Sequence, residues 1–329
     1  MPTTLSRRGF IGYATAIATA PVAAQSNPVM TKPVRILVGF PPGGSADLVA
    51  RALAQNLTTY ASTIVVDNRP GAGGRIALEA LKNSEADGAT LALTPASMLV
   101  LYPHIYKKLS YDPLSDFTAV APISSAQFVL TIGPMVPASI KTLAEFITWC
   151  KANSGQAAFG SSGSGSMPHF TGVALARAAN LSWTHVAYKG GAPALNDLLG
   201  GQIAANVGVL SNALVHVQSG KLRALAVSGS TRSSLLPDVP TLGEAGFKDA
   251  QASEWFGAVV PARTPPDIVQ KLHAALGESL KSRSLRDAMA RASFELAQAE
   301  SQADFARQLR ADHARWGAIV KASGFTPED

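Results

Sequence analysis

Cysteine is nearly absent from this chain of 329 residues, which contains a single one, Cys150. One cysteine excludes an intramolecular disulfide and any cysteine-rich zinc or iron–sulfur site. It lies in the apolar stretch at residues 146–150, so we expect a small buried hydrophobic residue. The six histidines never form a ligand-spaced pair. The sequence therefore predicts neither a metal nor a cofactor.

Charge is also scarce, at 15% of the residues against 47% that are hydrophobic. This balance excludes a disordered chain, and the lack of a heptad run excludes a coiled coil. The formal net charge of +6 is scattered without a stripe of lysine and arginine, so we expect no nucleic-acid partner. At about 100–200 residues per domain, the length predicts one large or two medium domains.

Long apolar runs are missing except near the N-terminus, where residues 1–24 are typical of a twin-arginine signal peptide. The pair Arg7 and Arg8 precedes an apolar segment at residues 11–22, and small residues offer a cleavage point before Gln25. That segment is about 12 residues long, whereas a membrane-spanning helix needs about 20. We expect cleavage and a soluble protein exported to the periplasm; an ordinary secretory signal or a permanent anchor is the alternative.

Strand and helix patterns alternate through the rest of the chain. Strands are expected at residues 34–38, 64–66, 90–94, 128–132, 157–159, 184–186, 203–209, 222–227 and 255–260. Helices are expected at residues 45–57, 76–81, 143–151, 170–179, 192–199, 268–280 and 305–320. This order predicts parallel βαβ units in two α/β halves. We expect one lobe to combine residues 28–127 with 252–329 and the other to span 128–251.

Two loops rich in glycine and serine are candidate anion sites: FPPGGSAD at residues 40–47 and GSSGSGSMPH at residues 160–169. Each follows an expected strand and opens an expected helix, where free amides and the helix dipole favour negative charge. Glycines let an anion approach the backbone, and serines add hydroxyl donors. One loop from each half could therefore hold a single anion across a cleft.

Neither loop matches a known catalytic or nucleotide-binding motif. The lysine of a phosphate-binding loop, the third glycine of a dinucleotide fingerprint and the flanking glycines of a hydrolase elbow are all missing. Asp47 is either a general base or, as is usual in a first helical turn, a capping residue. We expect no enzyme. The rival hypothesis is a periplasmic serine-dependent hydrolase that uses Ser162 and His169, although His169 at a helix start is more typical of a hydrogen-bonding residue.

Motifs that recur in one known family follow each other through nearly all of the mature chain. They are VRILVGFPPGGSAD at residues 34–47, DNRPGAGG at 67–74, YDP at 111–113, GSSGSGSMPH at 160–169, YKG at 188–190, DLLGGQ at 197–202, GKLRALAV at 220–227 and LPDVPT at 236–241. Together they resemble the Bug family, the extracytoplasmic solute receptors of tripartite tricarboxylate transporters.

The resemblance implies an α/β periplasmic binding protein with two lobes (a Venus flytrap, type II-like), each lobe a mixed, mostly parallel sheet flanked by helices. It implies capture of a small organic carboxylate in the interlobe cleft and delivery to the membrane subunits of a tripartite tricarboxylate transporter. We expect a monomer. A ligand sensor that feeds a signalling system is the alternative to transport.

Carried over by motif, the resemblance also assigns the ligand contacts. The first wall of the cleft would hold Phe40, Pro42, Gly43, Gly44, Ser45 and Asp47, with Thr94 and Ser97 beside it. The second wall would hold Ser161, Ser162, Gly163, Ser166 and His169, and a third group is Tyr188, Lys189 and Gly190. Lys189 is as readily a plain surface lysine. The ligand carboxylate would lie between the helices that begin at Ser45 and Ser166.

Two positions depart from the family pattern. Gly208 lies in a stretch where the family often has an Asp-Asn pair, so a polar contact to the far end of the ligand is expected to be missing. Glu254 stands where the family often has a small residue. It would disfavour a second carboxylate if it faces the cleft, and it would have no such effect if it points to solvent.

Overall fold

The computed structural model describes Met1 and residues 28–298, 300–323 and 325. The expected signal peptide and its cleavage point lie outside these residues, Met1 apart. Within the described part of the chain, no helix has the length and apolar character needed to cross a membrane.

Strands and helices alternate as the sequence predicts. The chain begins with β1 (Val34–Val38), α1 (Ser45–Asn56), β2 (Ile64–Asn68), the 3-10 turn η1 (Ala72–Gly74), α2 (Arg75–Lys82), β3 (Thr90–Pro95), α3 (Ser97–Val100), α4 (Tyr102–Ile105) and β4 (Phe117–Ile132). It continues with α5 (Leu143–Ala152), β5 (Ala158–Ser161), α6 (Met167–Ala178), β6 (Thr184–Ala187), α7 (Gly191–Leu199), β7 (Ala205–Val209), α8 (Leu210–Gln218) and β8 (Arg223–Val227). It ends with η2 (Lys248–Ala250), β9 (Ser253–Pro261), α9 (Pro266–Lys281), α10 (Arg283–Arg291), β10 (Phe294–Leu296) and α11 (Gln302–Ser323).

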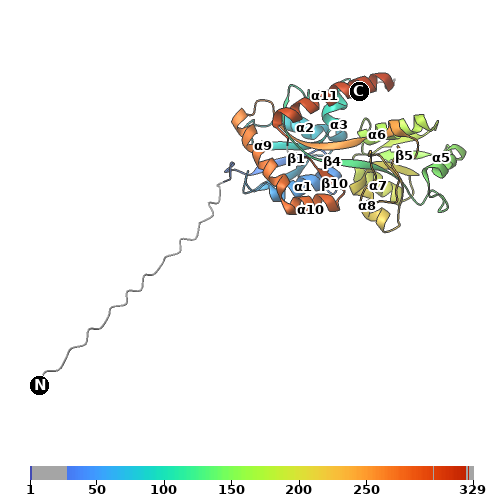
Figure 1. The fold of residues 1–329 in the computed structure, drawn as a ribbon. Helices are drawn as coiled ribbons and strands as arrows, with labels where there is room; N and C mark the ends of the chain where they lie inside the picture. The colour runs from blue at the N-terminus through green and yellow to red at the C-terminus, as the bar shows by residue number, and fades with distance from the viewer. Residues whose placement is uncertain (2–27, 299, 324, 326–329) are drawn as a thin grey trace.

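Strand β4 is the element that joins two sheets into one. Its N-terminal part pairs with β9 in the order β2-β1-β3-β9-β4, and Phe128–Ile132 pair with β7 in the order β4-β7-β5-β6. Strands β8 and β10 also pair with β4, β10 at Ser124–Ala126 in its middle and β8 at Val129–Ile132 near its C-terminal end. Figure 1 shows the result as two bodies side by side, with α1, α9 and α10 around one sheet and α5 to α8 around the other.

The sheets are mixed, but parallel pairing does not predominate as expected. Between the named strands it is confined to β2-β1-β3 and to β6-β5-β7, whereas β4, β8, β9 and β10 pair antiparallel with their neighbouring strands. The physical reason is the path of the chain, because β4 leads out of the first sheet and β9 leads back into it. Two neighbouring strands that carry the chain in opposite senses must pair antiparallel.

The interior of both bodies is mainly apolar. Helix α1 buries Val49, Ala50 and Leu53 against the first sheet. Cys150 is buried as expected, at 1% exposure, and burial raises the pKa of its thiol to about 12. A thiol with so high a pKa is unreactive at neutral pH, so Cys150 is a packing residue.

Candidate functional site

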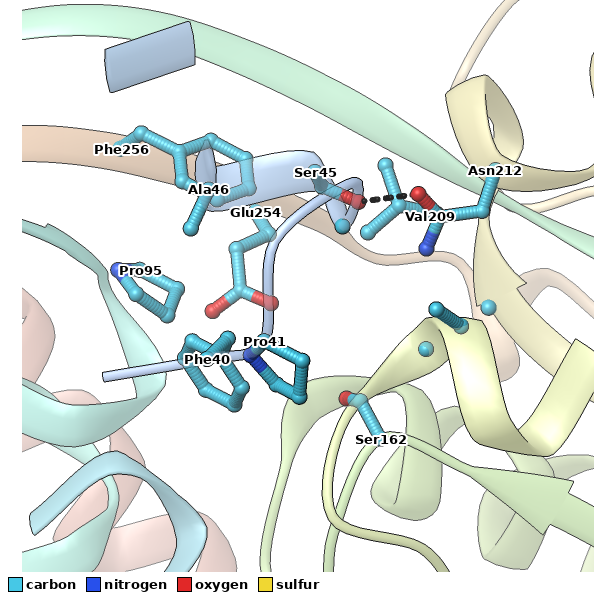
Figure 2. Close-up of a pocket in the computed structure, with 14 residues that line it drawn as sticks. Phe40, Pro41, Ser45, Ala46, Pro95, Ser162, Val209, Asn212, Glu254 and Phe256 are labelled. Atoms are coloured by element: carbon cyan, nitrogen blue, oxygen red, sulfur yellow. Dashed lines mark hydrogen bonds between the residues drawn. The ribbon is translucent and has the colours of Figure 1, made fainter. Parts of the chain in front are cut away.

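A cavity of about 40 Å³ lies where the two bodies meet (Figure 2). The body that contains β1, β3 and β9 contributes Phe40, Pro41, Gly44, Ser45, Ala46, Pro95, Glu254 and Phe256. The body that contains β5 and β7 contributes Ser162, Gly191, Ala192, Gly208, Val209 and Asn212. Of the predicted contacts, Phe40, Gly44, Ser45 and Ser162 therefore lie on this cavity.

Three helices begin at the wall of this cavity. Helix α1 starts after Gly44, α7 starts after Gly190 and α8 starts after Val209, and none of these three N-cap residues makes a side-chain cap in the structure as described. No N-cap side chain therefore accepts a hydrogen bond from the first amides of these helices. Each helix N-terminus also carries about half a positive charge. No lysine, arginine or histidine is among the described residues that line the cavity. Three uncapped helix ends thus supply its positive potential.

Helix α6, which was also expected to offer its N-terminus, begins at Met167 and is capped by its own residue. The Ser166 hydroxyl donates to the Gly163 carbonyl at 2.8 Å and accepts from the His169 amide at 3.4 Å. Ser166 and His169 are outside the cavity lining. The serine that was expected to bind the anion therefore closes the end of its own helix.

Asp47 anchors the loop before α1 and does not line the cavity. Its carboxylate accepts from the Gly43 amide, from Arg51 Nε and from Asn68 Nδ2, each at 2.9 Å. Burial alone raises the pKa of Asp47, but hydrogen bonds from Arg51, Gly43 and Asn68 outweigh this effect and lower the pKa below its usual value. Of the two roles considered for Asp47, the geometry favours the structural one.

We expect Asp47→Ala to lower the free energy of unfolding by about 2–3 kcal/mol, because hydrogen bonds to a buried charge are lost together. A folded-state pKa below the unfolded value means that this stabilisation is full above about pH 5 and is lost as the pH falls below about 4. Urea denaturation of both proteins across this range measures it. A difference that persists unchanged at pH 3, or a variant as stable as wild type at pH 7, would contradict this role.

The loop before α6 places the Ser162 hydroxyl on the cavity and buries those of Ser161 and Ser166. Ser162 points its side chain toward the cavity, near Pro41 (Figure 2). Ser161 is fully buried and shares hydrogen bonds with His185 Nε2 at 2.8 Å and the Gly163 carbonyl at 3.1 Å. Ser162 is therefore the one described residue of this loop that can reach a ligand in the cavity.

The geometry does not support the serine-hydrolase hypothesis. His169 stacks on His185 at 3.9 Å and its Nδ1 accepts from the Gly165 amide at 3.0 Å. The serine paired with a histidine is Ser161, which has no exposed surface and so no access for a substrate. Burial, with the neighbouring His169, lowers the pKa of His185 to about 3, too weak a base for the task.

The remaining predicted contacts lie around the cavity. Tyr188 donates its hydroxyl to Asp197 Oδ2 at 2.8 Å, and Lys189 is exposed. Thr94 bonds the Pro95 carbonyl at 3.3 Å, and Ser97 bonds Glu254. Gly190 is buried at φ +124°, and a Cβ there would lie 3.2 Å from Pro41 Cδ in the other body. Pro42, Gly43 and Gly163 are outside the lining, the first two exposed at the tip of their loop.

Asn212 on α8 is a cavity residue that sequence reasoning missed. It accepts a hydrogen bond from Ser45 Oγ at 3.0 Å, which joins the two bodies across the cavity (Figure 2). A Cβ on Gly191 would lie 2.2 Å from Asn212 Nδ2, so the glycine leaves room for this amide. Asn212, four residues after Gly208, thus brings a side-chain amide to the cavity wall.

Glu254 faces the cavity rather than solvent. Its side chain points from β9 toward Phe40 and Pro95 (Figure 2), and the residue is 3% exposed. Oε1 accepts from the Ser97 amide at 3.0 Å and from the Ser97 hydroxyl at 2.8 Å. Burial raises the pKa of Glu254 to about 7, although both hydrogen bonds act in the opposite direction.

Known proteins share this architecture and sequence. Residues 49–325 match the Tripartite tricarboxylate transporter family receptor. Protein BugT of Bordetella pertussis is 36% identical over 321 residues, which is 95% of each chain. The structure of an R. palustris protein with adipate matches with a TM-score of 0.84 at 29% identity, and the match covers 90% of this chain and 98% of that one. MatC from Rhodopseudomonas palustris with bound malate has a TM-score of 0.81 at 28% identity and covers 87% and 98%.

These matches confirm the resemblance to the Bug receptors and the expected periplasmic binding protein fold. They are to a family of solute receptors and not of enzymes, in agreement with the expectation of no catalysis. This chain belongs to the receptor family of the tripartite tricarboxylate transporters.

Proposed function

We propose that this receptor captures a small organic carboxylate in the periplasm and delivers it to the membrane subunits of a tripartite tricarboxylate transporter. The observation that carries the proposal is the set of three uncapped helix N-termini on one cavity, contributed by both bodies without a cation. A carboxylate placed there receives backbone donors and a favourable dipole field. The adipate and malate in the related structures are consistent with such a ligand.

We infer the two lobes to be residues 28–127 with 252–329 and residues 128–251. Support comes from the pairing of β4, which changes partner between Gln127 and Phe128. The ligand would enter with the lobes apart and would be enclosed as they rotate about β4 and β9. Export through the signal at residues 1–24 and a monomeric state complete the proposal.

A thermal-shift screen over small organic acids tests this function. A ligand present at about 100 times its Kd stabilises the folded state by about 2.7 kcal/mol, which raises the melting temperature measurably. Malate, adipate and their neighbours in chain length are the first probes. Stabilisation by a restricted group of acids is expected, whereas no response to any carboxylate would contradict the proposal.

A further inference from the structure

The cavity that is proposed to hold an anion also contains a buried carboxylate. Glu254 is 3% exposed, and Oε2 accepts no hydrogen bond from the described residues, since both Ser97 donors bind Oε1. No lysine, arginine or histidine of the described chain lines the cavity beside it. A buried carboxylate without a cation is unfavourable unless a further donor satisfies it.

The surroundings of Glu254 contain little that titrates. On β4 its partner across the sheet is Ala126, and from β3 the cavity receives Pro95. The titratable group that interacts with it is Tyr102 on α4, whose hydroxyl donates to the Gly73 carbonyl at 2.9 Å. Since no described residue donates a hydrogen bond to Oε2, such a donor must come from a molecule in the cavity.

The remaining walls near Glu254 suit a cation better than an anion. Phe40 and Phe256 line the cavity, and aromatic rings attract ammonium groups through their faces. A second ligand carboxylate beside Glu254 would meet a like charge, or it would have to bind with Glu254 protonated. A protonated amine would instead donate to Oε2 and neutralise the glutamate.

We propose that Glu254 makes this cavity selective for a ligand that carries a protonated amine in addition to its carboxylate. This inference rests on the proposed function, because the helix N-termini hold the carboxylate while Glu254 binds the ammonium group. The proposal narrows the class of ligand from organic carboxylates in general to zwitterions. A dicarboxylate of the same length should bind less tightly.

Matched pairs of probes test the proposal by calorimetry. The amino acids glycine, β-alanine, 4-aminobutanoate and 5-aminopentanoate are compared with malonate, succinate, glutarate and adipate, in which a carboxylate replaces the ammonium group. Wild-type protein should bind the amino member of the best pair at least tenfold more tightly. Glu254→Gln should abolish that preference, whereas Glu278→Gln, an exposed control on α9, should preserve it.

The pH profile of the wild-type protein gives a second readout that needs no variant. Because the pKa of Glu254 is about 7, lowering the pH from 8 to 6 protonates most of the carboxylate. Affinity for the amino acid should then fall by about tenfold, and affinity for the dicarboxylate should rise. In Glu254→Gln neither affinity should change between pH 8 and pH 6.

The outcomes separate this inference from the proposed function. If wild type prefers the dicarboxylates and Glu254→Gln leaves the ratio unchanged, the inference is overturned while carboxylate binding stands. The inference would also be overturned if Glu254→Gln lost affinity equally for both members of a pair and wild type showed no pH dependence. Glu254 would then only shape the cavity. If no member of either series binds, the inference is overturned and the proposed function loses support as well.

Discussion

A valine at position 191 should weaken ligand binding at least a hundredfold without unfolding the protein. Gly191 begins α7 at the cavity wall, and even a Cβ there would lie 2.2 Å from Asn212 Nδ2. The branched side chain would occupy much of a cavity of about 40 Å³ and displace the amide that bonds Ser45. Loss of one charge-assisted hydrogen bond and one neutral hydrogen bond costs about 3 kcal/mol of binding free energy, which raises the Kd by about two powers of ten.

Calorimetry with the best acid from the thermal-shift screen measures this effect. Gly155→Val is the matched control, since position 155 is exposed in the same body and a Cβ there meets nothing within 4 Å. The control should bind like wild type. Affinity of Gly191→Val within about threefold of wild type would show that the ligand does not use this cavity.

Gly165→Ala should weaken binding by tenfold or more because it opposes closure of the two bodies. A Cβ at position 165 would lie 1.6 Å from Ile105 Cδ1, which belongs to the opposite body. The backbone at φ +70° adds strain of about 1 kcal/mol, but this cost is present whether or not the bodies touch. In the proposed hinge motion, the clash with Ile105 arises only when the two bodies meet, so it should reduce affinity as well as stability.

Ile105→Val provides a direct rescue, because it removes the Cδ1 atom with which the alanine collides. The substitution costs about 0.5–1.5 kcal/mol of stability by itself. In the double variant Gly165→Ala/Ile105→Val, we expect most of the lost affinity to return. A double variant that binds as weakly as Gly165→Ala would contradict closure through this contact.

Elements with clear boundary residues could be predicted from the sequence, and those without them were missed. The Pro-Pro-Gly-Gly run follows β1, and α1 begins directly after it at Ser45, as expected. Helix α8 begins at Leu210 directly after β7 ends at Val209, with no glycine, proline or capping residue to signal it. Strand β4 was predicted only at residues 128–132, because register shifts near Ala119 and Pro122 interrupt its alternation.

The site was only partly predictable for a reason that lies in helix capping. From the sequence, we expected serines at a helix start to be donors to a ligand, but Ser166 caps α6 and Ser161 forms a hydrogen bond with His185. Gly44, Gly190 and Val209 cannot cap their helices with a side chain, and these are the helix ends at the cavity. The helix starts at the cavity are therefore those without a side-chain cap, and the serine-rich start of α6 is not among them.

The direction of Glu254 could also have been found from the sequence. Residues two apart on a strand share a face, so Glu254 lies on the same side of β9 as Phe256, and both line the cavity. Trp255 lies on the other side and donates its indole N–H to Asp312 Oδ2 at 2.9 Å. What the pattern could not show is that the shared face is the cavity wall, which requires the second body.

The most direct test of carboxylate binding by uncapped helix ends compares one acid with its own amide. The best acid from the thermal-shift screen and its primary amide have nearly the same shape and differ in the charge that the helix N-termini would hold. Calorimetry should show the acid binding at least a hundredfold more tightly, with little dependence on salt because the enclosed charge is poorly screened. Equal affinity for the acid and the amide would contradict carboxylate binding by the helix N-termini.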